Sequence, residues 1–135
     1  MSLTITILDA YQSQDIIDNL GKQAVSKNRR LFMTCAKVLQ ALIPITQTFD
    51  RWREAMVASY REKDAQGRSI IPPDKIKDFQ DKLVEYCSGT EELQNIGKIK
   101  ISHFFDANVF PSPAQVAVLN WLLEDDTDSI ALPQS

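Results

Sequence analysis

The chain has 135 residues and a formal net charge of −3 at pH 7, with 44% hydrophobic and 24% charged residues and few glycines or prolines. This is the composition of one globular domain, and it excludes disordered and collagen-like classes. No apolar run approaches the roughly 18 residues of a membrane-spanning helix, and the N-terminus lacks the features of a signal peptide. We therefore expect a cytoplasmic protein in which residues 1–125 form a single domain and residues 126–135 a disordered tail.

The N-terminal residues predict a short strand followed by a short helix. Apolar residues alternate with threonines over residues 3–7, which is typical of a half-buried strand. Asp9 then predicts a helix cap, and Gly21 predicts the end of that helix. The apolar face of this helix consists of Ile16, Ile17 and Leu20.

The strongest pattern in the sequence is a heptad seam. Eight apolar residues follow one another in phase: Leu31, Cys35, Val38, Leu42, Ile45, Phe49, Trp52 and Met56. The seam predicts one long helix, or two collinear helices, over residues 23–63. Pro44 lies inside this stretch and predicts a kink, because proline removes a backbone hydrogen bond. A helix of about 40 residues reaches roughly 60 Å, so either Pro44 bends it sharply or it projects towards a partner.

The later segments predict a second helix, a strand and a C-terminal helix. Residues 73–88 follow a charged turn and two prolines, and they carry apolar residues at helical spacing, so the two helices should form an antiparallel hairpin. Alternation over residues 98–102 predicts a strand that pairs with the N-terminal one. Ser112, Pro113 and Gln115 form the sequence of a capping box at the start of a helix. The expected fold is α+β, mostly α: a long kinked helix paired with a second helix, a small β-sheet and a C-terminal helix.

No motif of known chemistry occurs in the sequence, because the four glycines are scattered singly and form no phosphate-binding loop. His103 lies beside Ser102 and three residues before Asp106, a set that could support nucleophilic catalysis. Adjacent residues of a strand point to opposite faces, however, so Ser102 and His103 would not meet. We expect a strand-end histidine with an ordinary partner, and a protein that is not an enzyme.

The cysteines and the acidic C-terminal run indicate no metal centre. Cys35 and Cys87 lie at apolar helical positions and predict free thiols, unless the two helices pack at the same level and allow a disulfide. Two cysteines without nearby histidines cannot form a zinc site. The acidic run over residues 124–126 predicts a solvated chain end, with a loose divalent-cation site as the alternative. We therefore expect neither a cofactor nor a metal.

Three hypotheses for function remain, and the first is self-association into a homo-oligomer through the seam. The predicted interface residues are Leu42, Ile45, Phe49, Trp52 and Met56; the alternative is that the seam is internal core. The second hypothesis is a nucleic-acid-binding accessory protein. Its predicted phosphate-binding residues are Lys22, Arg29, Arg30 and Lys37, which would otherwise form the solvated face of an amphipathic helix. The third is an inhibitor or sequestering protein that acts on a host enzyme or a small ligand.

Three segments in the middle of the chain also follow a pattern seen in other proteins. They are residues 49–54 (FDRWRE), 60–67 (YREKDAQG) and 74–79 (DKIKDF). Over residues 25–102 the order of long helix, charged turn, second helix and apolar strand resembles small, uncharacterised proteins of tailed phages and prophages. The resemblance implies a phage-encoded accessory protein, and it carries over no site residue. A host or phage protein is a further partner that we consider beside a second copy of the chain.

Overall fold

The computed structural model describes residues 2–126, and its fold is α+β and mostly α, as predicted. Helices account for most of these residues, and each sheet within them has two strands. The elements in chain order are β1 (Ser2–Thr6), α1 (Ile7–Ala24), α2 (Arg29–Tyr60), β2 (Glu62–Lys63), β3 (Ser69–Ile70), α3 (Pro73–Cys87), β4 (Thr90–Gln94), β5 (Ile99–Lys100), α4 (Ile101–Asp106), α5 (Pro113–Val118), the 3-10 helix η1 (Leu119–Trp121) and β6 (Leu123–Glu124).

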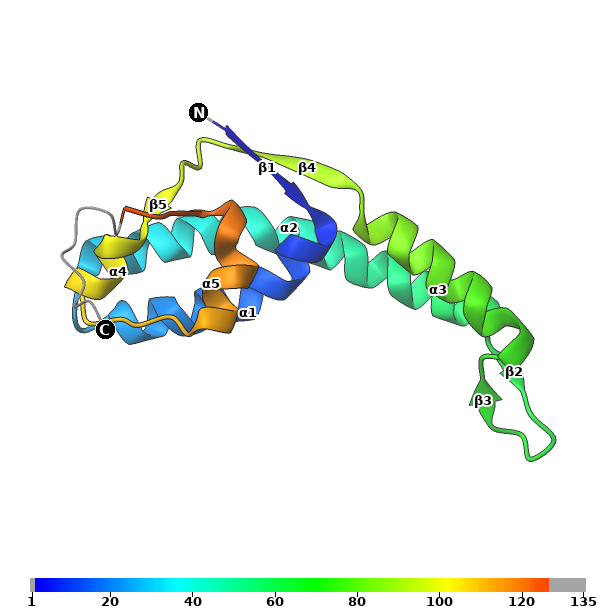
Figure 1. Ribbon diagram of the computed structural model, residues 1–135. Coiled ribbons are helices and arrows are strands. Elements are labelled where there is room, and N and C mark those ends of the chain that lie inside the picture. The colour runs from blue at the N-terminus through cyan, green and yellow to red at the C-terminus, as the bar shows by residue number, and fades with distance from the viewer. Residues whose placement is uncertain (1, 127–135) are drawn as a thin grey trace, which may run out of the picture.

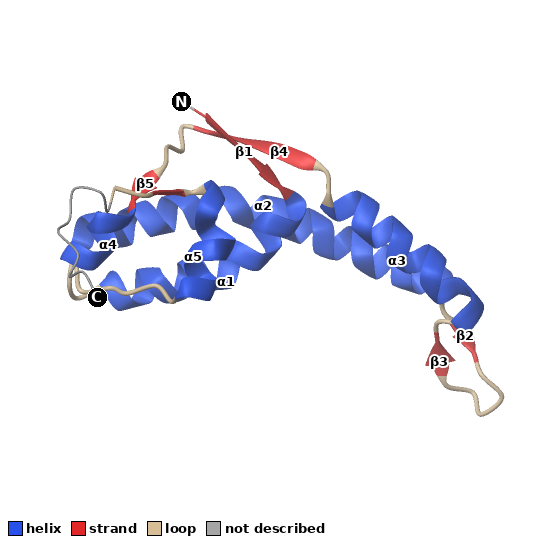
Figure 2. Cartoon of the chain, viewed as in Figure 1, coloured by secondary structure: helices blue, strands red, loops and turns tan. Residues whose placement is uncertain are grey.

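The molecule consists of a body and a projecting arm (Figure 1). We define the arm as residues 46–87, which comprise the second half of α2, the β2–β3 hairpin at the tip and α3. The body is formed by the remaining described residues, 2–45 and 88–126. They include α1, the first half of α2, α4 and α5 (Figure 2). The helix α2 passes from one part to the other as a single helix through Pro44. The predicted antiparallel pairing of α2 with α3 is confirmed, and of the two outcomes expected for the long helix, projection is observed.

The first helix boundary differs from the prediction, because the chain turns at residues 25–28 and separates α1 from α2. Thr6 rather than Asp9 caps α1, since the Thr6 hydroxyl accepts a hydrogen bond of 3.0 Å from the Asp9 amide. Gly21 does not end α1 but lies inside it, at a close approach to α2. A Cβ atom at Gly21 would lie 3.1 Å from Cβ of Cys35. A glycine that would otherwise end a helix is thus retained inside one because two helices meet there.

The core lies between α1 and the first half of α2, beneath β1, β4, α4 and η1. The buried positions of α2 are Leu31, Cys35, Val38, Leu42, Thr46 and Phe49. The predicted seam is followed at Leu31, Cys35, Val38, Leu42 and Phe49, but between the last two of these Thr46 rather than Ile45 is buried.

The predicted pairing of the N-terminal strand is wrong. β1 pairs antiparallel with β4, with Leu3 opposite Leu93, whereas β5 pairs in parallel with β6. Only Ile99 and Lys100 of the predicted strand 98–102 are extended, because α4 begins at Ile101. Ile101 and Phe104 are both buried and lie one helical turn apart, so burial favours the helix. The predicted capping box of Ser112 and Gln115 is present at the start of α5.

Candidate interaction surfaces

Aromatic rings hold the two helices of the arm together. Trp52 on α2 and Tyr86 on α3 are stacked with ring centroids 4.3 Å apart, and Phe49 lies 5.6 Å from Tyr86. Nearer the tip, the rings of Tyr60 and Phe79 meet edge to face at 5.8 Å. Ring pairs of this geometry are attractive beyond the area that they bury. These contacts therefore fix the position of α3 against α2.

The tip of the arm has its own polar structure. The Asp64 carboxylate accepts hydrogen bonds from the amides of Gln66 (2.9 Å) and Arg68 (2.8 Å), and it also pairs with the Arg68 guanidinium. Gly67 has a φ of 79°, a conformation that favours glycine. Behind the tip, the Tyr60 hydroxyl donates a hydrogen bond to Asp78, which lowers the pKa of that carboxyl. The hairpin that ends the arm is therefore a defined turn.

The helix α3 has no buried residue, although apolar residues recur along it. Phe79, Leu83 and Tyr86 are only half-buried, Ile76 is 40% exposed and Val84 is 69% exposed. Two helices packed side by side cover one stripe of each other and leave their flanks open. The arm therefore presents apolar side chains that no other segment within residues 2–126 buries.

One flank of the arm forms a groove of about 620 Å³ where α3 meets β4. Apolar and charged side chains line it: Ile7, Trp52, Met56, Lys82, Glu85 and Tyr86, together with residues 89–91. Aromatic and methionine side chains are enriched at the centres of protein interfaces, and methionine adapts its shape to a partner. This groove thus combines aromatic and methionine side chains with charged ones on an open flank of the arm.

The five predicted interface residues lie in two different environments. Leu42 and Phe49 are 0% and 3% exposed, and Ile45 packs against the core. Leu42 and Phe49 therefore belong to the interior of the chain, where a partner could not contact them, whereas Ile45 is partly buried. Trp52 and Met56 are partly exposed and line the groove. A self-association hypothesis therefore rests on the arm and not on the whole seam.

The four predicted phosphate-binding residues do not share one helix face. Lys22 belongs to α1, pairs with Asp18 at 2.9 Å, and lines a pocket between α1 and α2. Arg30 lines a groove on the other side of α2. Lys37 is two turns from Arg30 on the same face, whereas Arg29 is rotated by about 100° from it. The turn at residues 25–28 separates Lys22 from the others, which a single long helix would have aligned.

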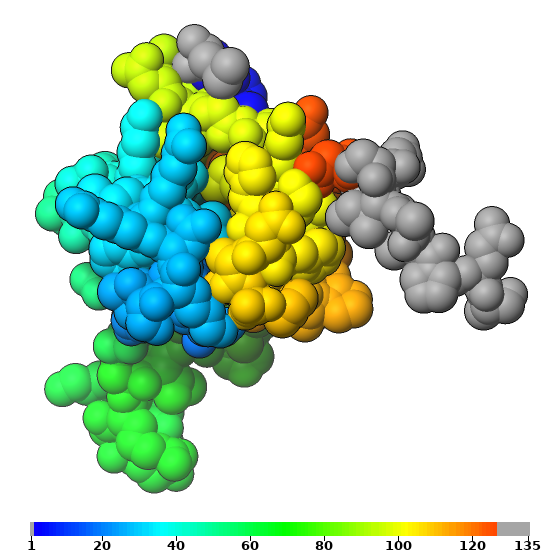
Figure 3. Space-filling model, turned by 90° about the vertical axis from the view of Figure 1, so that its left-hand side faces the viewer, coloured from blue at the N-terminus to red at the C-terminus, as the bar shows by residue number. Residues whose placement is uncertain are grey.

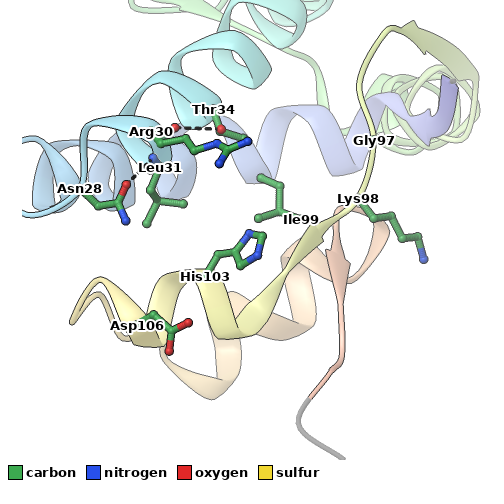
Figure 4. A pocket seen from close by; sticks show the side chains of 9 residues that line it. All are labelled: Asn28, Arg30, Leu31, Thr34, Gly97, Lys98, Ile99, His103 and Asp106. Atoms are coloured by element: carbon green, nitrogen blue, oxygen red, sulfur yellow. Dashed lines mark hydrogen bonds between the residues drawn. The ribbon is translucent and has the colours of Figure 1, made fainter. Parts of the chain in front are cut away.

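The groove that contains Arg30 has a volume of about 500 Å³ and lies between α2 and α4 (Figure 4). Its lining comes from three segments: Asn28, Arg30, Leu31 and Thr34; Gly97, Lys98 and Ile99; and His103 and Asp106. The His103 ring points from α4 towards α2, where Arg30 lies on the facing wall, while the Lys98 side chain points away (Figure 4). The sequence analysis missed this group, because only the fold brings Lys98 and His103 to α2. A prediction of a helix rather than a strand at residues 101–106 would have placed His103 and Asp106 on one helix.

The geometry does not assemble the catalytic set considered from the sequence. The Ser102 hydroxyl donates its hydrogen bond to Asp126, and the Ser102 amide donates to the same carboxylate at 3.0 Å. His103 lies on α4 and not at a strand end, and it orients no nucleophile. Within residues 2–126, no group of three or more histidine, cysteine, aspartate or glutamate residues could hold a metal ion. The predicted tail lies outside the described residues, apart from Asp126.

Both cysteines are free thiols, as predicted. Cys35 is buried between α1 and α2, and this burial raises its pKa to about 11. Cys87 ends α3, and burial also raises its pKa, although the nearby positive charge of Arg53 opposes that shift. A raised pKa lowers the fraction of reactive thiolate at neutral pH. Neither thiol therefore has the environment of an activated nucleophile.

Comparisons with known proteins give no relative: no family model, no curated protein and no solved structure matches the chain. The resemblance to phage proteins therefore stays a prediction. Among residues 2–126, no helix is both long and apolar enough to cross a membrane.

Proposed function

We propose that the chain is a non-enzymatic interaction protein that self-associates through its arm. The observation that carries this proposal is that α3 has no buried residue although it is amphipathic. An amphipathic helix gains stability by burying its apolar stripe against other helices. Two arms packed side by side would form a four-helix bundle, in which each hairpin covers an open flank of the other.

The charge of the arm favours a second copy of the chain as the occupant. Residues 46–87 carry equal numbers of basic and acidic residues, eight of each. The basic residues are Arg51, Arg53, Arg61, Lys63, Arg68, Lys75, Lys77 and Lys82. The acidic residues are Asp50, Glu54, Glu62, Asp64, Asp74, Asp78, Asp81 and Glu85. An arm of one sign would repel its own copy and select an oppositely charged partner, whereas a balanced arm allows self-pairing.

The groove at the base of the arm supplies the apolar centre of such an interface. Trp52 and Tyr86 are large rings that present part of their surface to solvent, and Met56 lies beside them. Tryptophan and tyrosine at the centre of an interface carry a large share of the binding energy. In a two-fold symmetric pair the same groove is covered twice, which doubles its contribution.

Light scattering coupled to size-exclusion chromatography tests the proposal. We expect the unmodified chain to elute at a multiple of its 15.3 kDa mass. Met56→Lys places a charge in the groove and should shift the mass towards that of a single chain. The matched control is Met33→Lys, the same substitution on the same helix but on the body, where Met33 is already 55% exposed. This control should keep the mass of the unmodified chain.

A second variant reports on the other flank of the arm. Val84 does not line the groove and is mostly exposed, so Val84→Lys should leave the folded chain intact, as its circular dichroism spectrum would show. A loss of assembly in this variant alone would place the second copy on that flank. A monomeric unmodified chain at micromolar concentration would contradict self-association. So would an unchanged mass in both arm variants.

A further inference from the structure

The groove between α2 and α4 lies in the body (Figure 4), and none of its lining residues belongs to the arm. Figure 1 shows α4 at the end of the molecule opposite the arm. We propose that this groove binds the phosphate of a nucleotide, either as a free nucleotide or within a single-stranded nucleic acid. The site differs from the basic face predicted from the sequence, because it excludes Lys22 and includes His103.

The groove brings nitrogen donors together from two walls. Arg30 reaches it from α2 and His103 from α4, and the imidazole points across towards α2 (Figure 4). Within the described part of the chain, Arg30 forms no salt bridge, so no carboxylate of residues 2–126 pairs with its guanidinium. A guanidinium beside an imidazole offers several N–H donors to the oxygens of one phosphate.

The first turn of α2 adds a second reason for an anion at this place. Arg29 and Arg30 are the first two residues of α2, and the turn contains no acidic residue. The N-terminus of a helix carries a partial positive charge, and the positive charges of two arginines at this end interact unfavourably with that partial charge. Figure 3 looks at this end of the body, where the start of α2 lies beside α4. A bound anion would relieve the repulsion that the chain otherwise maintains.

The shape and the remaining lining favour a nucleotide over a simple anion. A volume of about 500 Å³ falls in the range of sites for small organic ligands. Leu31 and Ile99 supply apolar walls, and the planar groups of Arg30 and His103 can stack on a base. Asp106 lies one turn beyond His103 on α4, where its carboxylate can accept a hydrogen bond from a ribose hydroxyl or a base amino group. Phosphate and base would thus be held by different parts of one groove.

Titration at low salt with four probes tests the site: AMP, adenosine, inorganic phosphate and a labelled short oligothymidylate. We expect AMP to bind more tightly than both adenosine and inorganic phosphate if the ligand is a free nucleotide. Binding of the oligothymidylate with no binding of AMP would identify a strand as the source of the phosphate. Equal affinity for inorganic phosphate and AMP would overturn the assignment to a nucleotide, and no binding of any probe would overturn the site.

Two variants then locate the binding. Arg30→Gln and His103→Gln should each weaken the productive probe by at least about tenfold, the effect of losing one charge-assisted hydrogen bond. Both side chains are exposed, so the folded chain should be retained. Lys22→Gln is the matched control, because it removes a positive charge at the same end of the body but outside the groove, and it should bind as the unmodified chain does. Unchanged affinity in both groove variants would place the ligand elsewhere and overturn the proposal.

Discussion

The indole Nε1 of Trp121 donates a hydrogen bond of 2.9 Å to the hydroxyl of Ser13, although 108 residues separate the two in the chain. Ser13 lies inside α1 and is fully buried, and it is one of two buried polar residues within residues 2–126. A buried hydroxyl is stable only when it is hydrogen bonded. This bond therefore fixes η1, and with it the C-terminal part of the described chain, on α1.

Replacing Ser13 tests this contact. Ser13→Ala removes the acceptor of the Trp121 indole, and a buried donor left without a partner costs about 1–3 kcal/mol. We expect a lower urea midpoint at an unchanged slope. Ser59→Ala is the control, because the Ser59 hydroxyl is exposed on the arm and bonds only to the Met56 carbonyl. An unchanged midpoint in Ser13→Ala would show that the bond contributes nothing to stability.

Leu42 separates a role in the core from a role in an interface. Because Leu42 is fully buried in the body, Leu42→Ala should leave a cavity and lower the free energy of unfolding by about 2–5 kcal/mol. The mass in solution should stay that of the unmodified chain at temperatures where the variant is folded. A folded variant of normal stability but lower mass would contradict the placement of Leu42 in the core.

The thiol of Cys35 predicts a dependence of stability on pH. Burial raises the pKa of this thiol from 9.0 to about 11, so the folded chain holds the proton more tightly than the unfolded chain does. Unfolding therefore releases this proton between pH 9 and 11, and the contribution of the group to stability is lost as the pH rises through that window. The decrease should amount to about 2–3 kcal/mol.

Chemical unfolding at several pH values between 8 and 11 measures this effect. Other groups titrate in the same window, so the comparison is with Cys35→Ala, which should show a shallower decrease than the unmodified chain. Cys87→Ala serves as the control, because Cys87 is less buried than Cys35. Parallel curves for the unmodified chain and Cys35→Ala would contradict the assignment.

Asp64 predicts a local effect at the tip of the arm. Asp64→Ala removes the acceptor of the Gln66 and Arg68 amides, so these amides should exchange their hydrogens faster. The tip is remote from the core, so the free energy of global unfolding should change by less than about 0.5 kcal/mol. Arg68→Gln removes the ion pair but keeps the hydrogen bonds from both backbone amides to Asp64, so slow exchange should be retained. Equal exchange in all three chains would mean that Asp64 does not order the turn.

Local patterns in the sequence were sufficient for the elements whose signals act within a few residues. The seam through Leu42 and the capping box at Ser112 depend on residues that are three or four positions apart. A local pattern of this kind can be recognised without knowledge of the tertiary structure. The hairpin of α2 and α3 followed from two such helices joined by a short charged turn. For these elements the sequence alone was enough, because the interactions that decide them lie close together in the chain.

The remaining features depended on tertiary packing. Residues 98–102 alternate as a strand does, yet Ile101 and Phe104 are also one helical turn apart, and the core buries both only when a helix begins at Ile101. Gly21 looks like the end of a helix, but the approach of Cys35 explains its place inside α1. The groove at Arg30 exists only because the fold brings His103 beside α2, since no local pattern relates residues from opposite halves of the chain. Burial of a shared core is a property of the whole chain, so it alone decided these features.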